Sequence, residues 1–180
     1  MKKLSHEEIT DKRIKLENIE QADKMPVAVL LNSIRSSYNV GSIFRTSDAA
    51  MVKKLYLCGY TPTPEKKEVL KTALGAQDSV DWEFFNNPLQ LVKRLKEKGY
   101  KIAALELTEN STDYTKIKND VFPLCLIVGN EISGVSQELI DECDFTIELP
   151  QYGIKQSLNV GVAYGISIFK LREIYENNKA

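Results

Sequence analysis

The chain has 180 residues, of which 43% are hydrophobic and 27% are charged. This length and composition predict one globular domain with a full core, or a core with a short appendage, and a second catalytic domain is not expected. The formal net charge of -1 and the isoelectric point near 6.0 show no global basic excess, so contacts with a polyanion would have to come from local clusters of Lys and Arg.

The cysteines and the amino terminus indicate the compartment. Cys58, Cys125 and Cys143 lack CxxC spacing, and the first two lie in apolar runs, which favours buried free thiols over a disulfide or a zinc site. The opening residues MKKLSHEEITDKR are charged from the start, and no apolar run approaches the roughly 18 residues of a membrane span. We expect a cytoplasmic protein with no membrane segment and no metal.

Residues 1–24 are predicted to form an amphipathic helix. Ser5 and Glu8 have the spacing of a capping box, and apolar residues recur in the charged stretch that follows. The dipeptide Met25-Pro26 is expected to end this helix.

Apolar runs of strand length follow, with helical patterns between them. The runs are Val27 to Leu31, Lys54 to Cys58, Lys101 to Leu105, Leu124 to Val128 and Phe145 to Leu149. The helical patterns are roughly Val40 to Ala50, Pro88 to Lys98, Ser136 to Asp141 and Leu158 to Tyr175. This alternation predicts an α/β domain with a parallel sheet over residues 25–175, followed by a tail of residues 176–180.

Two further features concern mobility and assembly. The segment Thr61 to Lys71, with two prolines and several charges, is expected to be a mobile loop.

The last predicted helix is apolar over most of its circumference, which indicates burial from several sides. We expect a second subunit to cover part of it, although a helix covered wholly by its own chain would show the same pattern.

The first candidate site is the segment Asn39-Val-Gly-Ser-Ile-Phe-Arg45, which follows the first predicted strand after a polar loop. Asn39 stands where a helix N-cap belongs, and Gly41 permits a backbone or a ligand to approach the first turn. The planar guanidinium of Arg45 can hold a phosphate or face a developing oxyanion. A plain cap followed by a solvated arginine is the alternative.

The second candidate site is the segment LIVGNEISG, residues 126–134, where a strand breaks into a loop. Open α/β sheets bind ligands at the carboxyl ends of their strands, and glycine allows backbone groups to contact an adenine or a ribose. An ordinary turn would explain Gly129 and Gly134 but not the charged Glu131 between them. The spacing matches neither GxGxxG nor GxxxxGK[ST], so it indicates neither a dinucleotide fingerprint nor a P-loop.

The third candidate site is the segment IELPQYGIKQSLNVG, residues 147–161. Pro150 stops a strand, and Ser157 is placed to cap the apolar helix. Asn159 falls in the first turn, where backbone donors and the helix dipole favour negative charge. Ser157 could also be a helix cap with no further role.

In combination, NVGSIFR, LIVGNEISG and IELPQYGIKQSLNVG resemble the three signature motifs of the TrmH-type ribose methyltransferases of the SPOUT superfamily. The resemblance covers roughly residues 25–172. It implies a carboxyl-terminal trefoil knot, S-adenosylmethionine bound in that knot, and a homodimer. By this resemblance the cofactor-facing residues are Gly129, Leu149 and Leu158, with Leu105 and Glu106 as a looser match.

The resemblance also implies the reaction, RNA 2′-O-methylation. Arg45 matches the family's essential arginine, and the other polar motif residues are matched by Asn39, Glu131, Ser157 and Asn159. Gly161 departs from the usual serine, which puts a polar contact there in doubt. Because a guanidinium keeps its proton in proteins, we expect Arg45 to clamp a phosphate and stabilise the attacking oxygen, with Asn39 fixing its orientation.

The RNA substrate is expected to be tRNA, with the ribose of a D-loop guanosine as the target, rather than rRNA; this rests on the resemblance alone. Arg35 is the favoured RNA-binding residue, because it shares a loop with Asn39. Other local cations are Lys2, Lys3, Lys12, Arg13, Lys15, Lys66, Lys67 and Lys71, which could equally be solvated surface charges.

Other functional classes fit the sequence less well. A dinucleotide-dependent oxidoreductase would need a Gly-rich first turn, which NSIRSSYNVG does not supply. A hydrolase using Ser157 would need a base, yet the lone His6 lies in the charged amino-terminal segment and there is no GxSxG motif. A knotted RNA-binding protein without turnover would be favoured if Arg45 or Asn39 were absent, and both are present.

Overall fold

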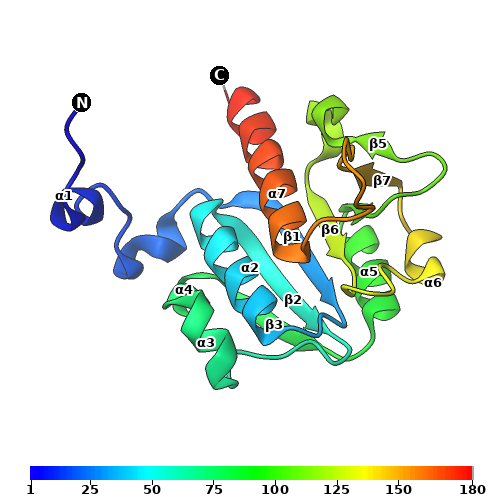
Figure 1. Ribbon diagram of the computed structural model, residues 1–180, viewed down its shortest axis with the longest axis horizontal. Coiled ribbons are helices and arrows are strands. Elements are labelled where there is room, and N and C mark those ends of the chain that lie inside the picture. Colours follow the sequence, from blue (N-terminus) through cyan, green and yellow to red (C-terminus); the bar gives the residue numbers. More distant parts are fainter. Residues whose placement is uncertain (180) are drawn as a thin grey trace.

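The computed structural model describes residues 1–179, and its centre is a seven-stranded parallel sheet (Figure 1). The strand order is β3-β2-β1-β6-β4-β7-β5. The strands are β1 (Met25–Asn32), β2 (Val52–Cys58), β3 (Trp82–Phe85), β4 (Lys101–Leu105), β5 (Thr112–Asp113), β6 (Leu124–Val128) and β7 (Phe145–Glu148). The predicted parallel α/β sheet is confirmed. The short edge strands β3 and β5 were not predicted, because neither contains a continuous apolar run.

The central strands are buried on both faces, as their apolar runs predicted. In β1, Val27, Val29 and Leu31 point into one core, while Leu30 points into the other. β6 alternates in the same way between Leu126 on the first side and Ile127 on the second. Side chains on opposite faces of one strand therefore hold two separate helical layers.

The helices form a layer on each face of the sheet (Figure 1). One layer contains α2 (Ser37–Ala49), α3 (Lys67–Ala73), α4 (Ala76–Ser79) and α7 (Val160–Asn177), and the other contains α5 (Pro88–Glu97) and α6 (Gln137–Ile140). The short 3-10 helices η2 (Tyr114–Lys116) and η3 (Asn119–Val121) precede β6. The predicted helix ending at Tyr175 continues to Asn177, so the predicted tail begins within α7.

The segment Thr61 to Lys71 is not a loop over its full length: Thr61, Pro62 and Pro64 are buried, and from Lys67 the chain is helical. Thr61 is buried, accepts a hydrogen bond from the Ile34 N–H and donates to the Leu31 carbonyl. Its last residues belong to α3, which packs closely on α2. A Cβ at Gly41 would lie 2.3 Å from the Val69 carbonyl oxygen, so the close approach that this glycine predicted is made by the α3 backbone.

Helix α7 packs beside α2 through a buried polar contact. The Tyr164 and Ser47 hydroxyl groups are 2.6 Å apart, and both residues are fully buried. Burial raises the pKa of the Tyr164 hydroxyl above its ordinary value, so it stays protonated as a hydrogen-bonding group. The outer side of α7 exposes Val162, Ile166 and Phe169, which recur at the spacing of one helical face.

The predicted helix over residues 1–24 is wrong. The capping box of Ser5 and Glu8 forms, but α1 covers only His6–Thr10 and the 3-10 helix η1 covers Leu16–Gln21. Neither element buries a residue, and the segment extends away from the sheet (Figure 1). A short helix with no packed face lacks the tertiary contacts that would stabilise it over its full length.

The cysteines are free, as predicted: Cys58 and Cys125 are buried and Cys143 is half-buried. Burial raises the pKa of the Cys143 thiol to about 12, which disfavours the reactive thiolate. Among the described residues, no helix is both long enough and apolar enough to cross a membrane.

Candidate functional site

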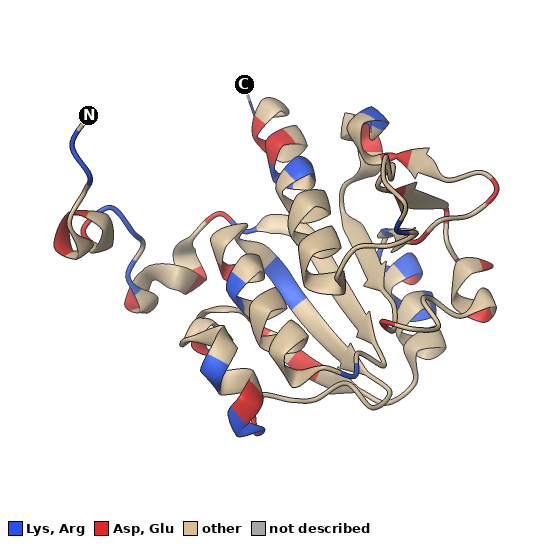
Figure 2. Ribbon diagram, viewed as in Figure 1, with Lys and Arg blue, Asp and Glu red and all other residues tan. Residues whose placement is uncertain are grey.

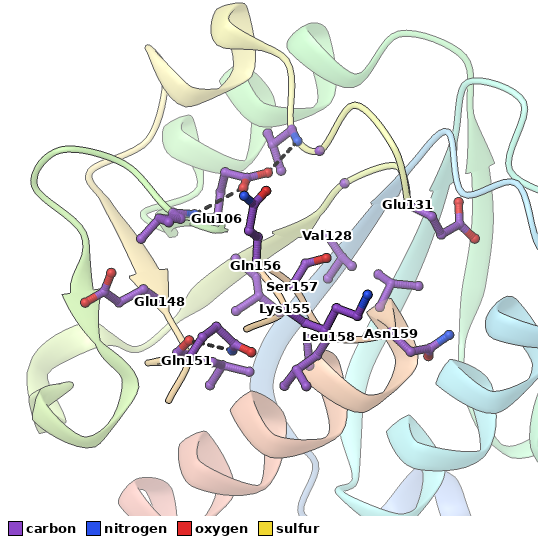
Figure 3. A pocket seen from close by; sticks show the side chains of 18 of the residues that line it. Glu106, Val128, Glu131, Glu148, Gln151, Lys155, Gln156, Ser157, Leu158 and Asn159 are labelled. Atoms are coloured by element: carbon purple, nitrogen blue, oxygen red, sulfur yellow. Dashed lines mark hydrogen bonds between the residues drawn. The ribbon is translucent and has the colours of Figure 1, made fainter. Parts of the chain in front are cut away.

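A cleft of about 870 Å³ opens at the carboxyl ends of β4, β6 and β7 (Figure 3). Its walls are the loop after β4, the loop after β6 and the segment 149–159 that leads into α7. All five residues predicted to face the cofactor line it: Leu105, Glu106, Gly129, Leu149 and Leu158. Strands whose carboxyl ends share one edge of the sheet thus bring together residues from distant parts of the chain.

The loop after β6 folds back on itself at the cleft. A Cβ at Gly129 would lie 2.3 Å from the Gly134 carbonyl carbon, so only glycine permits this return. The Asn130 side chain donates to the Ser33 carbonyl and to the Tyr60 hydroxyl, each at 2.8 Å. These bonds fasten the loop to the ends of β1 and β2.

Two carboxylates lie on the side of the cleft formed by β4 and β7. Glu106 accepts hydrogen bonds from the backbone N–H groups of Leu107 at 3.1 Å and Val135 at 2.9 Å. Glu148 Oε2 accepts from the Ser111 hydroxyl at 2.8 Å. Both anions are therefore held in place by neutral donors rather than by a neighbouring cation.

The three predicted motifs meet in one polar cluster at the cleft. Asn39 Nδ2 donates to Glu131 Oε1 at 2.8 Å, and Asn159 Nδ2 donates to Asn39 Oδ1 at 3.1 Å. Glu131 also accepts the backbone N–H groups of Arg35 at 2.8 Å and Ser36 at 3.0 Å. We name Asn39, Glu131 and Asn159 the Asn-Glu-Asn cluster.

The hydrogen bonds keep the cluster carboxylate charged. Partial burial raises the pKa of the Glu131 carboxyl, but the bonds from the Arg35 N–H, the Asn39 amide and the Ser36 N–H lower it. The net pKa lies below the ordinary value for glutamate. Glu131 is therefore an anion that organises the start of α2.

Both predicted helix caps are wrong by two or three residues. The Ser36 hydroxyl caps α2 by accepting the Asn39 N–H, which places Asn39 inside the first turn. The Asn159 side chain caps α7 by accepting the Gly161 N–H at 2.9 Å, and Ser157 instead lines the cleft. Ser and Asn cap equally well, so residue type alone could not choose between them.

The two arginines of the first motif region lie outside the cleft of their own chain. Arg45 is exposed on α2, roughly 9 Å further along the helix axis than Asn39. The Asn39 amide bonds Glu131 and Asn159, so it does not hold Arg45 as expected. Arg35 is exposed beside the Asn-Glu-Asn cluster, which its backbone N–H joins.

Sequence reasoning missed several residues at this site. Asn130 stands inside the second motif, and its position between Gly129 and Glu131 was a usable signal. Glu148 and Lys155 line the cleft from within the third motif. They were passed over because an isolated charge in a loop or at a strand end is usually solvated.

The cleft has the shape and the charge to hold S-adenosylmethionine. Its volume falls within the usual range for a small-molecule site, and its walls combine aliphatic side chains with loop backbone. Three carboxylates, Glu106, Glu131 and Glu148, line it together with one cation, Lys155. This excess of negative charge suits a ligand that carries a sulfonium and an ammonium group against a single carboxylate.

Comparison with known proteins agrees with this geometry. The model of the SpoU rRNA Methylase family matches residues 26–169. The chain belongs to this family and is an RNA methyltransferase of the SpoU/TrmH type. It is 34% identical over 171 residues to the tRNA (guanosine(18)-2′-O)-methyltransferase of Aquifex aeolicus, an alignment that covers 90% of this chain and 76% of that protein.

Solved structures share the fold. The A. aeolicus TrmH/SpoU tRNA modifying enzyme superposes with a TM-score of 0.81 at 29% identity, covering 91% of this chain and 84% of that one. The AdoMet-bound rRNA methyltransferase of Sinorhizobium meliloti superposes with a TM-score of 0.78 at 29% identity, covering 86% of this chain and 59% of that one. A putative TrmH family tRNA/rRNA methyltransferase of Staphylococcus haemolyticus is 33% identical, and this chain spans 61% of its length.

Proposed function

We propose that this protein transfers the methyl group of S-adenosylmethionine to a ribose 2′-oxygen of tRNA, with a D-loop guanosine as the target. The observation that carries the proposal is the Asn-Glu-Asn cluster, which joins all three motifs beside a cleft suited to the methyl donor. When bound, the donor supplies an electrophilic methyl group on sulfur. The protein has to align a ribose hydroxyl with that group and stabilise the attacking oxygen.

Arg45 is the group assigned to the attacking oxygen and its neighbouring phosphate. Its guanidinium keeps its proton, so it acts as a hydrogen-bond donor and a fixed positive charge. The 2′-hydroxyl proton leaves to water or to a phosphate oxygen of the RNA. Because Arg45 is exposed outside the cleft of its own chain, this role requires its side chain to reach a site beside α2 or in a second subunit.

The Asn-Glu-Asn cluster is assigned to positioning. Glu131 holds the first turn of α2 through backbone and side-chain donors, and Asn159 joins that turn to the start of α7. The ribose-binding region between these helices is thereby built before substrate arrives, which lowers the cost of alignment. Ser157 lines the cleft near this junction and is assigned a polar contact with the substrates.

A homodimer formed through α7 is part of the proposal. Val162, Ile166 and Phe169 are 38–52% exposed along one face of this helix, and Leu158 is exposed just before it. Contiguous apolar residues on the surface of a small domain usually mark an interface. A second copy placed there would lie next to α2, which carries Arg45 and packs beside α7.

A carboxyl-terminal knot and a tRNA substrate complete the proposal. The chain leaves β7 near one edge of the sheet and then returns across β4 and β6 to pack α7 on α2, a path that a knotted segment would follow.

A tRNA substrate is favoured by the A. aeolicus relative, of which this chain spans 76%. The alternative substrate is rRNA, which the S. meliloti structure suggests.

The RNA contacts are assigned to Arg35 and Arg45 rather than to the amino-terminal cations. Figure 2 shows that Lys and Arg are interleaved with Asp and Glu along the first segment of the chain. Such mixed charge gives little net attraction for a phosphate backbone. Arg35 instead lies beside the Asn-Glu-Asn cluster.

Labelled methyl transfer tests the proposal. The purified protein is incubated with methyl-labelled S-adenosylmethionine and either total tRNA or total rRNA, and the modified nucleotide is mapped. Label on a ribose 2′-oxygen of tRNA is the expected result. Label on bases or on protein, or no binding of the donor at all, would overturn the assignment.

A further inference from the structure

Lys155 is the one cation among the residues that line the cleft, where three carboxylates also occur. It lies in the segment 149–159 between β7 and α7, and its side chain runs along the cleft (Figure 3). Its ammonium group points toward the side on which Asn159 and Glu131 lie, away from Glu148 (Figure 3). The positive charge and the Glu106 and Glu148 carboxylates are thus separated across the cleft.

The Lys155 ammonium group is available to a ligand. Within residues 1–179, it makes neither an ion pair nor a hydrogen bond, although carboxylates line the same cleft. Those carboxylates are already engaged: Glu131 and Glu106 accept backbone N–H groups, and Glu148 accepts a hydroxyl. A lysine left unpaired beside three anions would gain most from an anionic group that enters the cleft.

The charges of the methyl donor show which of its groups needs this lysine. Its sulfonium and ammonium groups suit the carboxylates, but its own carboxylate would be repelled by three anions unless a cation faces it. We propose that Lys155 binds the α-carboxylate of the methyl donor and thereby holds the amino-acid end of the donor in the cleft. This inference rests on the proposed function, because it requires the donor to occupy this cleft.

Removing the Lys155 charge and the donor carboxylate, separately and together, tests the inference. Calorimetry measures the affinity of wild-type protein and of the Lys155→Met variant for S-adenosylmethionine and for its decarboxylated analogue. We expect wild type to prefer the carboxylated donor by about tenfold, the usual effect of one charge-assisted bond. Lys155→Met should bind the two ligands within about twofold of each other, and Lys155→Arg should retain most of the preference.

A second arm distinguishes the donor carboxylate from an RNA phosphate, which presents the same anionic oxygens. The affinity of each variant for tRNA is measured by fluorescence anisotropy, with Lys118→Met as the matched control for loss of one exposed lysine before β6. The inference predicts that Lys155→Met changes tRNA affinity no more than Lys118→Met does.

Three outcomes would overturn the inference. If Lys155→Met still prefers the carboxylated donor tenfold, another residue binds the carboxylate. If it weakens only tRNA binding, the lysine contacts a phosphate. If wild type binds neither donor form, the proposed function fails as well, which separates that failure from the first two.

Discussion

The Asn39 side chain donates from Nδ2 to Glu131 Oε1 at 2.8 Å, although the two residues are 92 positions apart in the chain. Asn39 belongs to the first turn of α2, and Glu131 belongs to the loop after β6. Because Glu131 also accepts two backbone N–H groups from the start of α2, a single carboxylate fixes the junction of two motifs. Replacing Glu131 should therefore weaken the attachment of α2 to the loop after β6.

The Glu131→Gln variant should be less stable than wild type. Glutamine has one acceptor oxygen, and its NH₂ group would face a backbone donor that the carboxylate now satisfies. We expect the free energy of unfolding in urea to fall by about 1 kcal/mol at neutral pH. Glu109→Gln, an exposed residue in the loop after β4, is the control and should change it by less than about 0.5 kcal/mol. An equal loss of unfolding free energy in the two variants would contradict the role of Glu131 in stabilising the start of α2.

The same carboxylate should make stability depend on pH in the acidic range. The Glu131 pKa is lower in the folded protein than its ordinary value of 4.5, so the unfolded chain binds the proton more readily. Its contribution is therefore present above that value and is lost as the pH falls through the folded-state pKa. The melting-temperature gap between wild type and Glu131→Gln should narrow from pH 7 to about pH 3. A gap that stays constant would argue against a charged role.

The Arg45→Lys variant should separate binding from turnover. Lysine keeps the positive charge but loses the planar fork that can contact a phosphate and the attacking oxygen together. We expect kcat to fall roughly 100-fold, while the affinity for S-adenosylmethionine, measured by calorimetry, stays unchanged. Arg94→Lys, whose guanidinium lies 5.5 Å from the Phe85 ring, serves as a control with normal turnover. Near-normal turnover of Arg45→Lys would refute the assignment.

The Phe169→Glu variant tests the α7 interface. Phe169 is 50% exposed in the single chain, and a charge there would be buried against the partner in the proposed dimer. Sedimentation velocity should show a dimer dissociation constant at least about 100-fold higher than that of wild type. Phe84→Glu alters a similarly exposed ring on β3 and should leave the association unchanged. Loss of association in both variants, or in neither, would be inconsistent with an interface at α7.

The Gly41→Ala variant tests the close approach of α2 and α3. Its Cβ would lie 2.0 Å from Thr72 Oγ1 and 2.3 Å from the Val69 carbonyl oxygen, so a backbone segment has to move. We expect a loss of about 1–3 kcal/mol in the free energy of unfolding. At Gly153 an added Cβ meets nothing within 4 Å, and Gly153→Ala should be close to neutral. If the free energy of unfolding of Gly41→Ala equals that of wild type, α2 and α3 can move apart at little cost.

The sequence alone determined the layered α/β fold and the place of its central strands. Strands such as Leu124–Val128 are buried on both faces, so every position is apolar and the run can be recognised without knowing its neighbours. It also predicted the three motifs as an ordered set that resembles a known family, although each motif alone fits an ordinary turn or helix cap as well. The edge strands β3 and β5 were missed because none of their residues is fully buried and neither forms a continuous apolar run.

Only the tertiary structure decided which polar groups meet and which do not. Ser36, Asn39, Ser157 and Asn159 are all competent caps, and only backbone geometry shows that Ser36 and Asn159 perform that role. The partner of Glu131 depends on where the loop after β6 lies relative to α2, a long-range relation that local sequence does not encode. For the same reason Arg45 could be recognised as a motif residue, but its position outside its own cleft could not.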